Sequence, residues 1–259
     1  MKISKVSKVL IALLMSTSVL VAGPAEKKGL EIAKKMDRSN TGFIGESSRM
    51  KMILINAYGD KIVREIVNKI KETRTDGDKS VVEFLSPKDV RKTKLLTWAH
   101  KRKNDSQWLY LPKSKKIKRI SSRSKSGAFM GSEFSYEDMG SQEVEKYTYK
   151  FIKDAKYKGR DVWVNTRYPV DKNSGYSKQI TYVDKKWLQP LKIEYYDRRG
   201  SLLKVATFRR YKKISGFWRA GKLTMSNRQT KKKSILQWSN RQLKKRFSDR
   251  EFTSGRLKN

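Results

Sequence analysis

The carboxylates best suited to acid–base chemistry lie in one short segment of the chain. Residues 129–139 read Phe-Met-Gly-Ser-Glu-Phe-Ser-Tyr-Glu-Asp-Met and carry Glu133, Glu137 and Asp138. An enzyme would combine such a carboxylate with a histidine or a metal ion, and the segment brings neither. Ion pairs with Lys or Arg also gather carboxylates in a structural role. We therefore favour a segment that plugs its aromatic side chains into the interior over one that performs catalysis.

Other residues with catalytic or metal-binding chemistry are scarce. The chain of 259 residues has no Cys and one His, His100. The lack of Cys excludes disulfides, thiolate zinc sites and thiol nucleophiles, and one imidazole cannot form a multi-histidine metal site. Gly127, Gly131 and Gly140 lack the strand–loop–helix frame of a phosphate-binding loop. We predict a binding or transport protein that is not an enzyme and uses no metal and no cofactor.

The charge of the chain is strongly basic. The 62 Lys and Arg outnumber the 25 Asp and Glu, which gives a formal net charge of +37. We expect five neighbouring cations to contact an anionic membrane surface: Lys113, Lys115, Lys116, Lys118 and Arg119. Anionic headgroups attract such residues by about 1 kcal/mol each. No nucleic-acid-binding motif is present, so we expect no specific nucleic-acid partner, and a merely solvated basic surface is the alternative.

The first 25 residues have the pattern of a secretory signal peptide. Lysines at positions 2, 5 and 8 precede an apolar run over residues 9–21, and the small residues Gly23 and Ala25 follow. This is the order of a cleaved signal, and the run falls short of the roughly 20 residues that span a bilayer. We predict cleavage after Ala25, which leaves residues 26–259 as a single soluble domain.

Hydrophobic periodicity predicts one helix followed by many strands. Apolar residues fall at helical spacing at Leu30, Ile32, Ala33 and Met36. From residue 50 onward they alternate with polar residues between turn sequences. Residues 62–73 fit either element, and their β-branched content favours a strand, whereas residues 113–132 read as a loop. We expect about ten or eleven antiparallel strands, because the connections are short, in a sheet that curls and leaves a concave face.

Several spaced motifs resemble one known family. Residues 129–139 are similar to the most recognisable stretch of the outer membrane lipoprotein-sorting proteins, whose fold is similar to the periplasmic lipoprotein carrier LolA. Further agreement is found in the pairs Glu83-Phe84 with Ser86-Pro87, Trp-Leu-Tyr-Leu-Pro at 108–112 with Lys-Arg-Ile at 118–120, Pro-Leu-Lys at 190–192 with Tyr-Tyr-Asp at 195–197, and in Phe252-Thr253.

This resemblance implies both a fold and a function. The fold is mainly β with few helices, a strongly curved antiparallel half-barrel sheet with helices across its concave face. The function is that of a monomeric carrier in the periplasm of a Gram-negative bacterium, which shields lipid or lipoprotein acyl chains during transport toward the outer membrane. An inner-membrane exporter of the RND/MMPL family is the implied partner. The rivals are a polyanion-binding envelope protein and a lipid-sensing protein without transfer activity.

Aromatic and apolar residues, most of them in these motifs, are the candidates for the lipid cavity or its lid. They are Phe129, Met130, Phe134, Tyr136, Trp98 and Trp108. Glycines at 127, 131 and 140 would give residues 129–139 the backbone freedom of a mobile lid. The alternative is a segment that fills the core permanently.

Overall fold

The computed structural model describes residues 23–258, so the predicted signal peptide lies almost entirely outside the described residues. Within that range no helix is both long and apolar enough to cross a membrane. The predicted helix is confirmed as α1, Pro24–Asn40. Proline is compatible with the first helical turn because its missing N–H has no intrahelical partner there, and Gly42, at φ +93°, follows the end of the helix.

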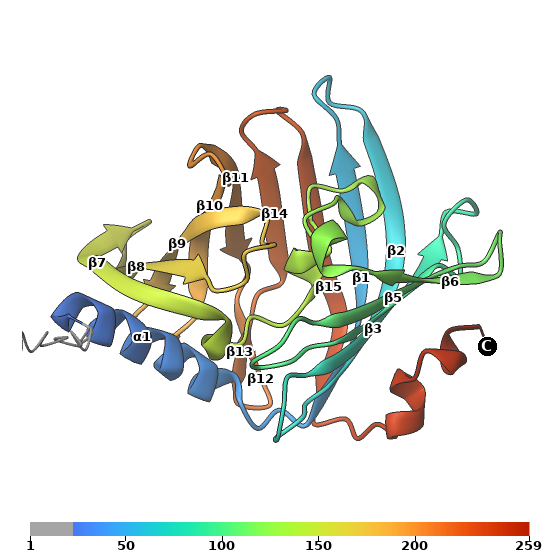
Figure 1. The fold of residues 1–259 in the computed structure, drawn as a ribbon, viewed down its shortest axis with the longest axis horizontal. Coiled ribbons are helices and arrows are strands. Elements are labelled where there is room, and N and C mark those ends of the chain that lie inside the picture. Colours follow the sequence, from blue (N-terminus) through green and yellow to red (C-terminus); the bar gives the residue numbers. More distant parts are fainter. Residues whose placement is uncertain (1–22, 259) are drawn as a thin grey trace, which may run out of the picture.

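Thirteen strands form one antiparallel sheet in the order β6-β5-β4-β3-β2-β1-β15-β14-β11-β10-β9-β8-β7. The strands are β1 Gly45–Ile55, β2 Lys61–Lys71, β3 Lys79–Ser86, β4 Lys94–Trp98, β5 Ser106–Leu111, β6 Lys116–Ile120, β7 Tyr147–Tyr157, β8 Arg160–Pro169, β9 Tyr176–Asp184, β10 Pro190–Asp197, β11 Leu202–Arg209, β14 Lys222–Asn227 and β15 Lys233–Leu243. The sheet is curved but not closed, and β6 and β7 are its two edges (Figure 1). The half-barrel fold expected from the resemblance is confirmed.

The number of strands exceeds the prediction of ten or eleven. Strands β12, Lys212–Ile214, and β13, Phe217–Arg219, form a separate hairpin. A further strand, β6, lies inside residues 113–132, which were expected to be a loop; that expectation was wrong for Lys116–Ile120. Its sequence is dominated by cations, so no apolar alternation marks it, and its pairing with β5 supplies the backbone hydrogen bonds. Of the ambiguous residues 62–73, all but the last two form a strand, β2, which ends at Lys71.

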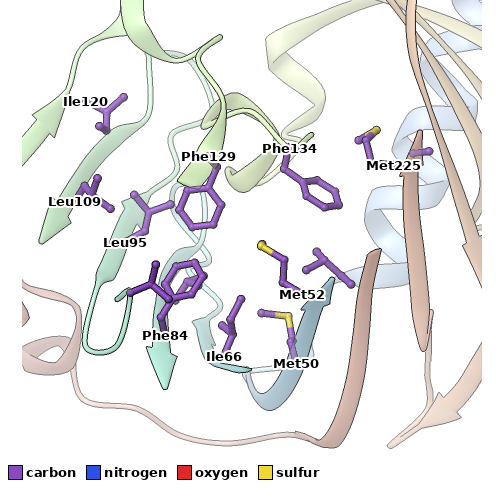
Figure 2. Close-up of a cluster of buried hydrophobic side chains, with 14 of the residues drawn as sticks. Met50, Met52, Ile66, Phe84, Leu95, Leu109, Ile120, Phe129, Phe134 and Met225 are labelled. Carbon is purple, nitrogen blue, oxygen red and sulfur yellow. The ribbon is translucent and has the colours of Figure 1, made fainter. Parts of the chain in front are cut away.

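The connection between the two edge strands crosses the open side of the sheet (Figure 1). It contains four short 3₁₀ turns: η1 Ser122–Ser124, η2 Phe129–Gly131, η3 Glu137–Met139 and η4 Val144–Lys146. Phe129 and Phe134 point from it into a core formed by the inner face of the sheet (Figure 2). Their side chains are 0% and 2% exposed. This connection therefore fills part of the concave face.

The outer face of the sheet carries a second, smaller core. Leu96 and Tyr110 pack there against Phe252 and Leu257. The latter two belong to the C-terminal turns η5, Asp249–Phe252, and η6, Gly255–Lys258, so the end of the described chain covers the convex side of β4 and β5. On the inner side, α1 packs against β7 through Ala33, Tyr147 and Tyr149.

Candidate functional site

A cavity of about 640 Å³ lies between α1 and the inner face of the second half of the sheet. The helix contributes Ala33 and Met36. The strands and the crossing connection contribute most of the apolar wall, namely Phe134, Val183, Ile193, Phe208, Leu223 and Met225. A cavity of this size and character is within the range of small-molecule sites.

Strand alternation explains how the wall is built. On β10, Ile193 and Tyr195 face the cavity, whereas Lys192 and Glu194 alternate with them and form an ion pair of 2.6 Å. Side chains at every second position of a strand share one face. The period-2 pattern of residues 191–196 thus places an apolar stripe on the concave side and charges on the opposite side.

Polar groups also line this cavity. Arg219 pairs with Glu46 at 3.3 Å and donates to Asn40 Oδ1 at 2.9 Å. Arg167 forms hydrogen bonds with amide oxygens only, at Gln179 and Gln142. The cavity is therefore amphipathic, with an apolar wall and three guanidinium groups, those of Arg74, Arg167 and Arg219.

Carboxylates from three segments form one part of the lining: Asp37, Glu72, Asp76, Asp78 and Glu143. Burial, together with the negative charges of Glu143, Glu72 and Asp37, raises the pKa of Asp78 to about 7. Burial also raises the pKa of Glu143. Asp78 consequently binds and releases its proton near neutral pH.

The segment 129–139 touches the cavity at only two of its residues. Phe134 and Asp138 line it, whereas the candidates Phe129, Met130 and Tyr136 lie in the adjoining core. The rings of Phe84 and Phe129 are 5.8 Å apart, centre to centre. Phe84, Phe129 and Phe134 belong to the same hydrophobic core, of which only Phe134 reaches the cavity.

Polar contacts fix the same segment to the sheet. Lys204 Nζ lies 2.6 Å from Asp138 Oδ2, and Tyr176 donates its hydroxyl to Asp138 Oδ1 at 2.8 Å. Lys125 Nζ is 3.8 Å from Glu137, and Glu133 accepts from the amide of Asn227. Two of the three carboxylates are thus engaged with lysines, as the structural role predicted.

The other two aromatic candidates do not line the cavity. Trp98 and Trp108 lie on the convex face, with their rings 5.1 Å apart. Trp98 donates its indole N–H to the carbonyl of Phe252 at 2.7 Å. Their neighbours Leu95 and Leu109 face the inner core. Because β4 and β5 carry apolar residues on both faces, their sequence pattern does not indicate which face is inward.

The five candidate cations lie on the surface at one edge of the sheet. Lys113, Lys115, Lys116, Lys118 and Arg119 are all exposed. Lys113 and Lys115 lie in the turn before β6, and the other three lie on the strand. The guanidinium of Arg119 is 5.9 Å from the ring centre of Trp108. The cluster is accessible and lies away from the lining of the cavity.

A second cavity, of about 360 Å³, lies between the two open edges of the sheet. Gln107 and Ile120 line it from one edge, and Tyr147 from the other. Ion pairs span it, with Lys125 2.6 Å from Asp171 and Lys146 in contact with Asp105. Lys101, Ser141 and Gln142 line both cavities, so the two adjoin.

His100 has a structural position. Its ring is buried, and Nδ1 lies 2.6 Å from Asp76 Oδ2, a hydrogen bond that lowers the pKa of Asp76. Within residues 23–258 no group of three or more His, Cys, Asp or Glu is arranged to hold a metal ion. The pair ties the turn before β3 to the end of β4.

Sequence reasoning did not single out Arg167, Lys204 or Tyr176. Each lies on a strand of unremarkable composition, and the two cations are among 62 in the chain. Only the fold brings them to the inner face, so no local signal could have distinguished them.

Comparisons with known proteins match nearly the whole described chain. A family model described as an uncharacterized protein matches residues 76–259. Among solved structures, a domain named for outer membrane lipoprotein sorting from Vibrio parahaemolyticus is 44% identical, with a TM-score of 0.89, over 90% of this chain and 100% of that one. A DUF1329 family protein from Desulfovibrio piger is 29% identical, with a TM-score of 0.86, over 90% and 99%.

A more distant structure extends the likeness of the fold. A LolA superfamily protein from Nitrosomonas europaea is 17% identical, with a TM-score of 0.71, over 88% of this chain and 98% of that one. At this identity the match concerns the fold alone. Among curated proteins, none matches significantly.

Proposed function

Because this chain belongs to the outer membrane lipoprotein-sorting family, we propose that it is a periplasmic carrier that shields acyl chains of a lipid or lipoprotein during transport toward the outer membrane. The family match at 44% identity covers the whole of the related domain. The carrier would take up its cargo without breaking a bond, so the proposal is a binding protein and not an enzyme.

The observation that carries the proposal is the apolar wall of the larger cavity. Phe134, Leu223 and Met225 present carbon surface to an internal space of about 640 Å³. Each methylene group moved from water into such a space contributes about 0.8 kcal/mol. A cargo with a chain of several methylene groups would therefore bind usefully without any covalent step.

The basic edge would bring the carrier to a membrane. Exposed lysines of the 113–118 stretch suit an anionic membrane surface, where charge raises the association rate more than the equilibrium affinity. An RND/MMPL-family exporter would supply the cargo, and the carrier would act as a monomer. This partner follows from the resemblance of the family, and the exposed cations are compatible with it.

Binding of a fluorescent fatty acyl probe tests the proposal. We expect the mature protein to bind the probe and Leu223→Trp to reduce binding strongly, because the larger side chain fills the cavity. Ile62→Trp is the matched control, since Ile62 is 53% exposed and does not line the cavity, so the variant should bind normally. Equal binding by both variants, or no binding by the parent protein, would contradict a lipid cavity.

Two further measurements address transfer and location. A carrier should release the probe to acceptor vesicles, whereas a lipid sensor would bind it without transfer. Mass spectrometry of lipids that co-purify with the exported protein should identify the cargo. The intact mass of the same sample should correspond to a chain that starts at Glu26, and retention of residues 1–25 would exclude a freely diffusing carrier.

A further inference from the structure

Arg167 is a half-buried cation that lacks a carboxylate partner among the described residues. Its Nε donates to Gln179 Oε1 at 2.8 Å, and its Nη2 donates to Gln142 Oε1 at 3.0 Å. The guanidinium also lies 4.5 Å from the ring centre of Tyr147. A guanidinium withdrawn from water is usually matched by an anion, and here neutral amide oxygens and an aromatic face take that place.

Two other guanidinium groups near the larger cavity are already matched. Arg219 and Arg241 both contact Glu46, at 3.3 Å and 2.9 Å. Asp138, a carboxylate of the crossing segment, is engaged by Lys204. Arg74 also lines the cavity but is exposed to solvent, and the buried Arg64, which donates to the carbonyl of Met130, lies outside the lining. Arg167 therefore differs from Arg219 in having no counter-charge and from Arg74 in being partly withdrawn from water.

Arg167 lies where the two cavities adjoin. Arg167 lines the larger cavity, and its partner Gln142 lines both. Gln142 Oε1 accepts a second hydrogen bond from the hydroxyl of Tyr147 at 2.7 Å, and Tyr147 lines the smaller cavity. The guanidinium thus lies where the amphipathic larger cavity meets the polar smaller one.

The smaller cavity has unpaired positive charge. Of its five lining cations, Lys125 and Lys146 form ion pairs, whereas Lys101, Arg102 and Lys103 form none with another described residue. Three of its four lining carboxylates are paired, which leaves Glu145. Because Lys125 contacts both Glu137 and Asp171, the charge of the lining is the difference between five cations and four carboxylates, 5 − 4 = +1, before Arg167 is counted.

The volume of the larger cavity limits the apolar part of a ligand. A methylene group takes up about as much space as a water molecule in the liquid, roughly 30 Å³. A cavity of about 640 Å³ then holds on the order of twenty such groups. This content corresponds to one long acyl chain.

We propose that the ligand is a single-chain amphiphile with an anionic headgroup, bound with its acyl chain in the larger cavity and its anion at Arg167 where the cavities adjoin. Phosphate and carboxylate headgroups share the chemistry that a guanidinium recognises, and Nη1 is the nitrogen of Arg167 that makes no hydrogen bond to another described residue. Lys101, Arg102 and Lys103 would add longer-range attraction from the smaller cavity. The inference rests on the proposed function, because it requires that the larger cavity binds an acyl chain.

The test compares probes that differ only in headgroup. Competition against a fluorescent acyl probe would be measured with palmitoyl lysophosphatidylglycerol, palmitoyl lysophosphatidylcholine and palmitate. We expect the anionic lysolipid to bind about tenfold more tightly than the zwitterionic one. Both carry a phosphate, but the choline cation of the second offsets the phosphate charge and is repelled by the cations of the site. If palmitate binds as tightly as the anionic lysolipid, the ligand carries a carboxylate. If palmitate binds more weakly, the ligand carries a phosphate.

Two variants separate Arg167 from the general basic charge. Arg167→Gln and Gln142→Glu should both bring the ratio between the lysolipids close to one; the second places a carboxylate beside the guanidinium at an exposed position that should not disturb folding. Lys61→Gln is the control, since it removes one positive charge on the exposed β1–β2 hairpin and should keep the tenfold ratio.

The outcomes distinguish this inference from the proposed function. No binding of any probe would refute the acyl cavity itself. Equal binding of both lysolipids by the parent protein, or an unchanged ratio in Gln142→Glu, would overturn the role of Arg167 while leaving the carrier function in place.

Discussion

Lys204 on β11 and Asp138 on the crossing connection form a buried ion pair, with 2.6 Å between Nζ and Oδ2 and side-chain exposures of 5% and 7%. Lys204 also donates to the carbonyl of Glu133 at 2.9 Å. Both ends of the aromatic segment around Phe134 are thereby attached to the same strand. The position of the segment over the concave face depends on this pair as well as on its apolar contacts.

Breaking the pair on one side should destabilise the protein strongly. Lys204→Met leaves the carboxylate of Asp138 buried without its counter-charge, for which a loss of about 3–5 kcal/mol in the free energy of unfolding is expected. Urea unfolding would measure it. The control is Lys34→Met, whose partner Glu31 is on the surface and whose loss should cost less than about 1 kcal/mol. Similar losses in both variants would show that Asp138 does not need Lys204.

Phe134→Ala distinguishes a permanent plug from a mobile lid. The side chain of Phe134 is 2% exposed. If it belongs to the core at all times, its truncation should lower the free energy of unfolding by about 3–5 kcal/mol. A lid residue would cost little in the empty protein but would weaken binding of the fluorescent acyl probe. Thermal unfolding and probe binding are measured on the same variant. A large loss of stability with unchanged binding by the folded fraction would exclude the lid.

The raised pKa of Asp78 predicts a pH dependence of stability. The folded protein holds this proton up to about pH 7, whereas the ordinary pKa is 3.8. Between these values the folded state binds more protons than the unfolded state, so the free energy of unfolding should fall as the pH rises. Asp78→Asn should remove that part of the slope and should be more stable than the parent protein at pH 8.

The control for this comparison is Asp161→Asn, because Asp161 is 68% exposed and its substitution should leave the pH profile unchanged. Unfolding curves at several pH values between 4 and 8 would be compared. A parent protein and an Asp78→Asn variant with parallel profiles would show that Asp78 is ionised throughout the range.

Gly29 permits α1 to lie directly on the sheet. A Cβ atom at this position would be 2.8 Å from the backbone nitrogen of Phe151 and 2.9 Å from Asn165 Oδ1. Alanine favours helices by about 1 kcal/mol over glycine, but here it should destabilise by about 1–3 kcal/mol because the helix must move outward. Gly255→Ala is the matched control, since nothing lies within 4 Å of its added carbon. Equal unfolding midpoints would refute the close packing.

The elements with regular apolar patterns could be predicted from the sequence, and their pairing partly so. The helix around Ile32 and Ala33 follows from periodicity alone. The strand around Ile66 needs the β-branched content as well, because its periodicity fits either element. The pairing of β1 with β15 joins distant parts of the chain, and nothing in either strand specifies it. Register between such strands is set by the whole core.

The candidate site was predicted less completely for a physical reason. Phe134 is marked by its place in a dense aromatic segment, and it does line the cavity. Trp98 and Trp108 were chosen by residue type, but the C-terminal residues Phe252 and Leu257 give the convex face its own apolar cover. The C-terminal tail, residues 247–259, is short and mostly polar in sequence, so it did not indicate this cover. Arg167 acquires its significance only from the lack of a nearby carboxylate.

Lysines of the basic edge should control association with membranes. Replacing Lys113, Lys115, Lys116 and Lys118 with Gln should slow association with anionic vesicles several-fold at low salt, because steering depends on local charge. The difference should shrink near 0.1 M salt, where screening limits the interaction to about 10 Å. The control is the quadruple Gln variant of Lys61, Lys156, Lys213 and Lys231. It removes the same charge from scattered exposed positions.

Those lysines also have a second physical effect, which the same experiment must separate. Strand β6 is a sheet edge, and charged side chains on an edge prevent pairing with another molecule. Size-exclusion chromatography of both quadruple variants should show monomers before vesicle kinetics are compared. Slower association only in the variant of the 113–118 stretch supports local steering. Equal rates for the parent protein and that variant at low salt would mean that the basic edge has no role in reaching the membrane.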